Sequence, residues 1–227
     1  MPLPPRMPDA PLTTNAVVYL HGFASSARST KAGFLRERFA ERGVTLGCPD
    51  FNQPDFSSLT LTRMLDQLDA ELSALDGGPA TLIGSSLGGA LAVLAAERFP
   101  TRIGRLVLLA PAVLFAKEGH HLLTPERIEE WRRLGRRPFF HFADRAERLL
   151  DFSFYEDSLR YNPFDAMFSQ PTLILQGLHD TSVDCRTVEA FARRRPNISL
   201  VLLDDEHQLV SSLPHIWERI VTFMETP

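Results

Sequence analysis

Short apolar runs alternate with amphipathic stretches along most of the chain. The apolar runs are rich in Val, Ile and Leu and stop at glycine, proline or polar residues, which is typical of buried strands. They predict six strands, at residues 16–20, 44–48, 80–84, 105–111, 172–177 and 198–204. Helical spacing of apolar positions predicts helices at residues 29–43, 59–75, 87–99, 187–195 and around 215–224. Alternating strands and helices imply parallel βαβ units.

This alternation stops between residues 112 and 168. A structureless loop of that length is uncommon in a compact domain, so the segment predicts an inserted cap. We expect a flexible lead at residues 1–14, a core formed by residues 15–111 and 169–227, and a cap at residues 112–168. Of the 21 aromatic residues, 11 fall in the cap, and residues 138–157 are typical of a β-hairpin. The rings could form the cap's own core, the apolar underside of an acyl pocket, or both.

A serine between small residues stands where the third predicted strand ends, in the run Gly84-Ser85-Ser86-Leu87-Gly88. A strand followed by G-x-S-x-G and a helix is typical of a nucleophile elbow. Such a turn strains the central residue, Ser86, and needs Gly84 and Gly88 because larger side chains would collide with it. It would present Ser86 at the carboxyl edge of the sheet, where open α/β folds bind ligands. The alternative is a plain tight turn without chemistry.

An acid and a base follow in the order that acyl transfer needs. Asp180 comes after the fifth strand, and His207 comes just past the last one. His215 also lies downstream, but its place at the start of the last helix favours a surface position. Asp184 precedes a helical stretch, where an N-cap role is ready for it. Since a serine needs a base and the imidazolium needs a carboxylate, we predict a triad of Ser86, His207 and Asp180.

The stretch "YLHGF" after the first strand adds the donors that a tetrahedral oxyanion requires. Its Phe23 N–H would lie beside the elbow, and the Leu87 N–H would be the second donor of an oxyanion hole. We expect His21, which precedes the glycine of this motif, to brace the loop through hydrogen bonds rather than to react.

These motifs resemble the α/β-hydrolase superfamily over nearly the whole chain. The first loop, "YLHGFASSARSTKAGFL", is similar to that of small bacterial serine carboxylesterases with an H-G-F-x-S-S-x-x-S-x-K pattern. The resemblance implies an α/β-hydrolase fold of about six mainly parallel strands flanked by helices, with a cap insertion after the fourth strand. It implies the same roles for Ser86, His207, Asp180, Phe23 and Leu87. The chain departs from the superfamily in lacking the usual leading antiparallel strands.

Composition narrows the choice of partners. With 24 basic and 28 acidic residues, the net charge of −4 gives no sign of a nucleic-acid partner. No segment approaches the roughly 20 apolar residues that cross a bilayer, and the proline-rich start lacks the apolar region of a signal peptide. Two isolated cysteines, Cys48 and Cys185, argue against a disulfide framework. We expect a cytoplasmic protein with a small-molecule substrate and no membrane partner; the oligomeric state stays open.

Two other clusters are weaker signals. His120 and His121 could suggest a metal site, but no third ligand has a recognisable spacing, so we predict neither metal nor cofactor. The arginines of residues 132–137 could grip an anionic group such as a CoA phosphate, although a solvated helix face is the simpler interpretation.

The sequence therefore predicts a serine hydrolase that cleaves carboxylic esters of small to medium acyl chains through an acyl-enzyme intermediate. A thioesterase or a serine peptidase would share this mechanism, as would cofactor-free perhydrolases, and the sequence does not separate them. A binding protein on a silent hydrolase scaffold is the alternative from another class. The three intact triad residues argue against it.

Overall fold

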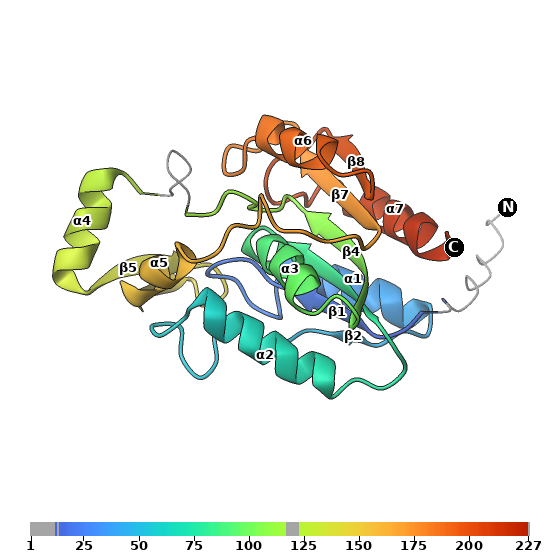
Figure 1. Ribbon diagram of the computed structural model, residues 1–227, viewed down its shortest axis with the longest axis horizontal. Helices are drawn as coiled ribbons and strands as arrows, with labels where there is room; N and C mark the ends of the chain where they lie inside the picture. Colours follow the sequence, from blue (N-terminus) through green and yellow to red (C-terminus); the bar gives the residue numbers. More distant parts are fainter. Residues whose placement is uncertain (1–11, 13, 117–122, 227) are drawn as a thin grey trace, which may run out of the picture.

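A parallel sheet of six strands forms the centre of the protein, as a computed structural model describes it for residues 12, 14–116 and 123–226 (Figure 1). The strand order is β2–β1–β3–β4–β7–β8, and the pairings within it are parallel in the described part of the chain. The strands are β1 (Val17–Leu20), β2 (Leu46–Gly47), β3 (Ala80–Ser85), β4 (Ile103–Leu109), β7 (Thr172–Gly177) and β8 (Ile198–Leu203). The predicted fold class is confirmed.

Two hydrophobic cores lie on opposite faces of this sheet, because successive side chains of a strand point to opposite sides. Val18 and Leu20 of β1 belong to one core, and Val17 and Tyr19 belong to the other. The first core is covered by α2 (Leu61–Ser73), α3 (Leu87–Arg98) and α6 (Cys185–Arg193). The second core is covered by α1 (Thr30–Glu41) and α7 (Leu213–Glu225).

Local signals in the sequence set the helix ends. Ser29 caps α1 by accepting a hydrogen bond from the Ala32 N–H, and Gly43, with φ +73°, follows the end of that helix. The predicted N-cap of α6 is confirmed, since the Asp184 carboxylate accepts a hydrogen bond from the Arg186 N–H at 3.0 Å. No helix in the described part of the chain is long and apolar enough to cross a membrane.

The segment between β4 and β7 lies to one side of the sheet (Figure 1). Its described elements are α4 (Pro125–Leu134), β5 (Arg136–His141), β6 (Ala146–Asp151) and α5 (Ser153–Ser158). Strands β5 and β6 pair antiparallel, which confirms the predicted hairpin. Gly135, with φ +74°, ends α4, so Arg136 and Arg137 stand in β5. The arginine run therefore does not form the single helix face that we expected.

Aromatic rings hold this hairpin to the rest of the protein. The Trp131 ring contacts the Phe139 ring at 5.1 Å between centroids, and Phe139 meets Phe23 of the first loop edge-on at 5.4 Å. The Phe142 N–H also donates to the Ala24 carbonyl at 2.8 Å. Most of the predicted lead at residues 1–14 and the pair His120–His121 lie outside the described residues.

Candidate active site

Ser86 stands at the turn between β3 and α3 with an unusual backbone. Its φ of +53° and ψ of −115° lie in a region that residues with a side chain avoid. Such a conformation costs on the order of 1–3 kcal/mol, and strain of this kind gathers at functional sites. The sharp turn aims the Ser86 hydroxyl away from the helix that begins at the next residue.

The two glycines of the elbow are needed for close backbone approach. A Cβ on Gly84 would collide with the Gly88 carbonyl, and a Cβ on Gly88 would collide with the Leu20 carbonyl of β1. The predicted requirement for small residues therefore has a different cause from the one expected. The clashes are with the backbone of Gly88 and of Leu20 and not with Ser86 itself.

Three side chains from three separate loops meet at the carboxyl edge of the sheet. The Ser86 hydroxyl lies 3.1 Å from Nε2 of His207, and Nδ1 of His207 lies 2.8 Å from Oδ2 of Asp180. An Nδ1–H that donates to Asp180 leaves the Nε2 lone pair free to accept the Ser86 proton. The Asp180 side chain is fully buried, while the His207 ring keeps 17% exposure.

Asp180 is held by more than the histidine. Its Oδ1 accepts the N–H groups of Ser182 and Val183, both at 2.8 Å, and its Oδ2 also accepts from the Gln176 amide at 3.0 Å. Burial alone would raise the pKa of the Asp180 carboxyl. The hydrogen bonds from His207 and from the Val183 amide outweigh burial and lower that pKa. The carboxylate is therefore ready to stabilise a positive charge on the imidazole.

Gln176 was missed by the sequence reasoning. It is a fully buried amide at the carboxyl end of the apolar strand β7, and its Nε2 also contacts the Val183 carbonyl at 3.2 Å. A lone amide inside the run "TLILQG" was the signal, because a buried polar side chain needs a partner.

Ser85, the other serine of the elbow, has a different environment. It is 4% exposed, and its side chain makes a hydrogen bond with the buried Tyr19 hydroxyl, which also bonds to Ser29. Burial raises the pKa of Tyr19 to about 12, so the hydroxyl stays neutral. This contact joins the elbow to Ser29, the residue that caps α1.

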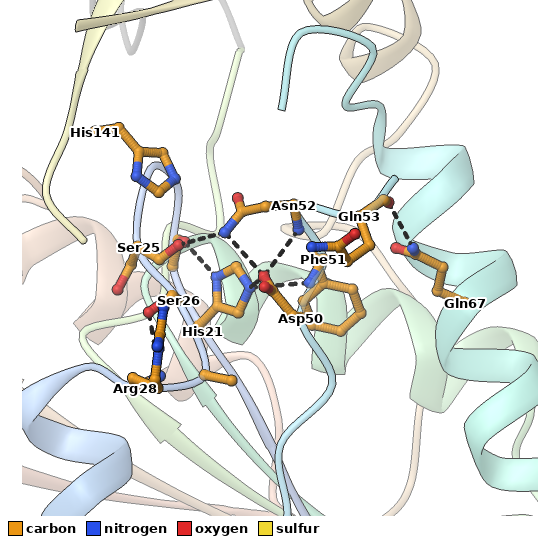
Figure 2. Close-up of polar contacts among 12 residues, drawn as sticks. His21, Ser25, Ser26, Arg28, Asp50, Phe51, Asn52, Gln53, Gln67 and His141 are labelled. Atoms are coloured by element: carbon orange, nitrogen blue, oxygen red, sulfur yellow. Dashed lines mark hydrogen bonds and ion pairs between the residues drawn. The ribbon is translucent and has the colours of Figure 1, made fainter. Parts of the chain in front are cut away.

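The first loop is braced by His21, as we expected. Its Nε2 accepts the Phe51 N–H at 3.0 Å, so the ring proton belongs on Nδ1, which lies 2.9 Å from the Gly22 carbonyl (Figure 2). The Asn52 amide donates to the Ser25 carbonyl at 2.8 Å and to the Asp50 carboxylate at 2.9 Å. These bonds fix the backbone on both sides of Phe23. No motif in the sequence pointed to Asp50 and Asn52.

The remaining histidines and acids near these loops are engaged elsewhere. His179 pairs with Asp204 at 2.7 Å on the surface, and His215 lies exposed near Glu218.

The described residues contain no cluster of three or more side chains suited to a metal. Both cysteines are free thiols.

An apolar cavity of about 40 Å³ lies between the first loop and the segment that joins β4 to β7. Its walls include the rings of Phe23, Phe115, Trp131, Phe139, Phe154 and Tyr155. Phe23 connects it to the elbow region, because the Phe23 N–H is one of the two donors expected for the oxyanion and the Phe23 ring lines the cavity.

Known structures define the class of fold. The α/β hydrolase domain-containing protein 10 from mouse superposes with a TM-score of 0.75 at 19% identity, covering 94% of this chain and 90% of that one. Est1E from Butyrivibrio proteoclasticus, solved with bound ferulic acid, gives a TM-score of 0.73 at 22% identity, covering 96% and 92%. The protein therefore has the α/β-hydrolase fold.

Within that class, the chain belongs to the uncharacterised protein family UPF0227, whose model matches residues 16–225. A curated relative, the biotin biosynthesis bifunctional protein BioHC of Teredinibacter turnerae, is 34% identical over 143 residues, which are 61% of this chain and 22% of the relative. The matched region spans well under half the length of the curated relatives, 22% and 38% in the two cases.

Proposed function

We propose that this protein is a serine hydrolase that cleaves carboxylic esters of small to medium acyl groups. One observation carries the proposal: the continuous hydrogen-bonded line from Ser86 through His207 to Asp180, with distances of 3.1 and 2.8 Å. This arrangement suits nucleophilic catalysis, since it couples a hydroxyl to a base and the base to a buried carboxylate.

The steps follow from this geometry. Ser86 Oγ attacks the ester carbonyl carbon while its proton passes to Nε2 of His207. The oxygen that gains negative charge is held by the N–H groups of Phe23 and Leu87. The imidazolium then gives the proton to the leaving alkoxide, which departs as an alcohol. Water, deprotonated by the same Nε2, attacks the acyl-enzyme, releases the acid and restores the Ser86 hydroxyl.

The cavity supports a small, apolar acyl group. Its walls are almost entirely aromatic or aliphatic, and its volume of about 40 Å³ is a few times what one water needs, about 10–15 Å³. Burying a methylene there is worth about 0.8 kcal/mol. The likeness of the first loop to that of small carboxylesterases, and the ferulate bound to Est1E, support an ester as the substrate.

A thioesterase remains the alternative within the same mechanism, and a serine peptidase stands behind it. The discriminating experiment measures kcat/KM for p-nitrophenyl esters of graded acyl length beside matched thioesters and a peptide anilide. We expect the esters of short to medium chains to be the best substrates. A thioester series that exceeds the matched esters at every length would replace the carboxylesterase proposal.

Ser85→Ala and Ser86→Ala form the matched pair of controls. Both remove one hydroxyl from neighbouring residues of the same turn. We expect Ser86→Ala to lose all turnover and Ser85→Ala to keep measurable activity. A fully active Ser86→Ala protein would mean that the observed hydrolysis comes from another site or a contaminant.

We also propose a cytoplasmic location. The two free thiols, Cys48 and Cys185, support a reducing compartment. Cell fractionation with an antibody against the native chain tests it, and recovery from an extracytoplasmic fraction would contradict it.

A further inference from the structure

Lys31 is a buried cation that the proposed mechanism does not use. It is 7% exposed and stands at the second residue of α1. The start of a helix carries partial positive charge, and burying an ammonium costs free energy, so both features make this an unfavourable place for a lysine. A side chain kept in such a position is expected to have a specific partner.

That partner belongs to the loop of the candidate base. The Lys31 ammonium donates to the Gln208 carbonyl at 2.8 Å, across 177 positions of the chain. Gln208 directly follows His207 in a tight turn closed by the Leu209 N–H, which donates to the Glu206 carbonyl at 3.1 Å. Leu209 has φ +54°, so this turn is strained and needs support from outside.

Carboxylates surround the ammonium from two loops. Asp180 approaches from the loop after β7 and Asp205 from the loop after β8, and both favour the charged form of Lys31. Burial opposes them more strongly and lowers the pKa of Lys31 to about 8. Asp205 is itself fixed, since it accepts the N–H groups of Glu206 and Ser212 at 2.8 Å.

We propose that Lys31 is a positioning residue of this site, whose ammonium holds the Gln208 carbonyl and thereby keeps the His207 ring aligned with the Ser86 hydroxyl. The inference rests on the proposed function for its catalytic readout. The ammonium donates to the Gln208 carbonyl, so it acts through the histidine loop.

The test replaces Lys31 with methionine, which keeps the length of the side chain and removes both the charge and the donor. We expect kcat to fall about 10- to 100-fold, because small displacements of a catalytic group have effects of this size. We expect KM to change little. The melting temperature should change little, because an unfavourable buried charge is lost together with a hydrogen bond.

Arg42→Met is the matched control. Arg42 is also a buried cation, 8% exposed, at the other end of α1, where it pairs with Glu225 at 2.8 Å. We expect this variant to lose thermal stability while kcat stays as in the wild type. If Lys31→Met shows that same pattern, or keeps a wild-type kcat, Lys31 is merely structural and the proposal is wrong.

Two further measurements keep the test decisive. If Lys31→Met fails to fold, Lys31→Gln is measured instead: its shorter side chain has no charge and does not reach the Gln208 carbonyl, so kcat should still fall at least about tenfold with unchanged circular dichroism, and a wild-type kcat overturns the proposal. If the wild-type protein cleaves no ester, the proposed function fails. Lys31 is then judged from the rate at which a fluorophosphonate labels Ser86, which Lys31→Met should lower and Arg42→Met should not.

Discussion

The carboxyl edge of the sheet and the segment between β4 and β7, the predicted cap, are built by opposite means. At the edge, directed hydrogen bonds fix the candidate catalytic groups: the Asp180 carboxylate alone accepts from two backbone N–H groups, the Gln176 amide and His207. In the cap, packed aromatic rings hold the elements together, and the Trp131 ring contacts the rings of Phe139 and Phe152. The structure of the edge therefore depends on the directions of hydrogen bonds, and the structure of the cap depends on how well its side chains pack.

This difference separates reactivity from selectivity. A hydrogen-bonded group tolerates little change, because removing one partner leaves a buried polar atom unsatisfied. A packed apolar wall tolerates substitutions that conserve volume and responds gradually to those that do not. Changes at the edge should therefore abolish turnover, and changes in the cap should shift which acyl group is preferred.

Asp180→Asn should produce the largest effect. The amide keeps the shape of the side chain but cannot compensate the imidazolium charge and favours the wrong tautomer of His207. If the triad logic applies in full, kcat falls by about 10⁴-fold while the fold survives. Steady-state kinetics and a melting curve measure both quantities.

Asp184→Asn is the control from the same loop. Asp184 caps α6 through the Arg186 N–H, and asparagine caps helices nearly as well. We expect wild-type kcat and at most a small loss of stability. An inactive Asp184→Asn beside an active Asp180→Asn would reverse the assignment of the acid.

The dependence of kcat/KM on pH, on the acid side, tests the role of His207 at the carboxyl edge of the sheet. A protonated His207 cannot accept the Ser86 proton, so kcat/KM should fall as the imidazole is protonated, and His207→Gln should be inactive. The profile is measured from about pH 5 to pH 9, the range in which histidine ordinarily titrates. A flat profile across it would count against His207 as the base.

For the cap we expect a smaller and graded effect on kcat/KM as the length of the acyl chain changes. Each added methylene of the acyl chain should raise kcat/KM about fourfold, from about 0.8 kcal/mol of burial, until the cavity is full. Phe139→Leu enlarges the cavity and should move the optimum to longer chains, with kcat for short esters nearly unchanged. An optimum that stays in place would mean that these rings only stabilise the cap.

The smallest expected effect is on stability at low pH. The pKa of Asp180 is lowered in the folded state, so its carboxylate stabilises the fold above the unfolded value of about 3.9, and this contribution is lost as the pH falls through the lower folded value. The melting temperature of the wild type should therefore drop more steeply below about pH 4 than that of Asp180→Asn. Equal slopes would show that the carboxylate carries no such coupling.

Much of the fold could be predicted because its signals are local. The six apolar runs, the N-cap at Asp184 and the turn around Ser86 each depend on residues that are neighbours in the chain. The α/β-hydrolase fold limits where loops can meet, so the order of serine, acid and histidine was enough to name three side chains that the structure brings together.

What the sequence did not reveal depends on long-range contacts. Nothing near Lys31 indicates that it reaches Gln208, and nothing near Asn52 indicates that it binds the Ser25 carbonyl. The expectation of one helix face for the arginines of residues 132–137 was wrong because Gly135, inside this run, ends α4. Such contacts arise only when separate segments fold together.

Covalent labelling of the native protein tests the central claim, that Ser86 is a nucleophile activated by His207 and Asp180. A fluorophosphonate probe is incubated with the wild type, Ser85→Ala, Ser86→Ala and His207→Gln, and the modified peptide is located by mass spectrometry. The account predicts a single label on Ser86 in the wild type and in Ser85→Ala, and none in the other two variants. A label on Ser85, or no label on the folded wild-type protein, would contradict it.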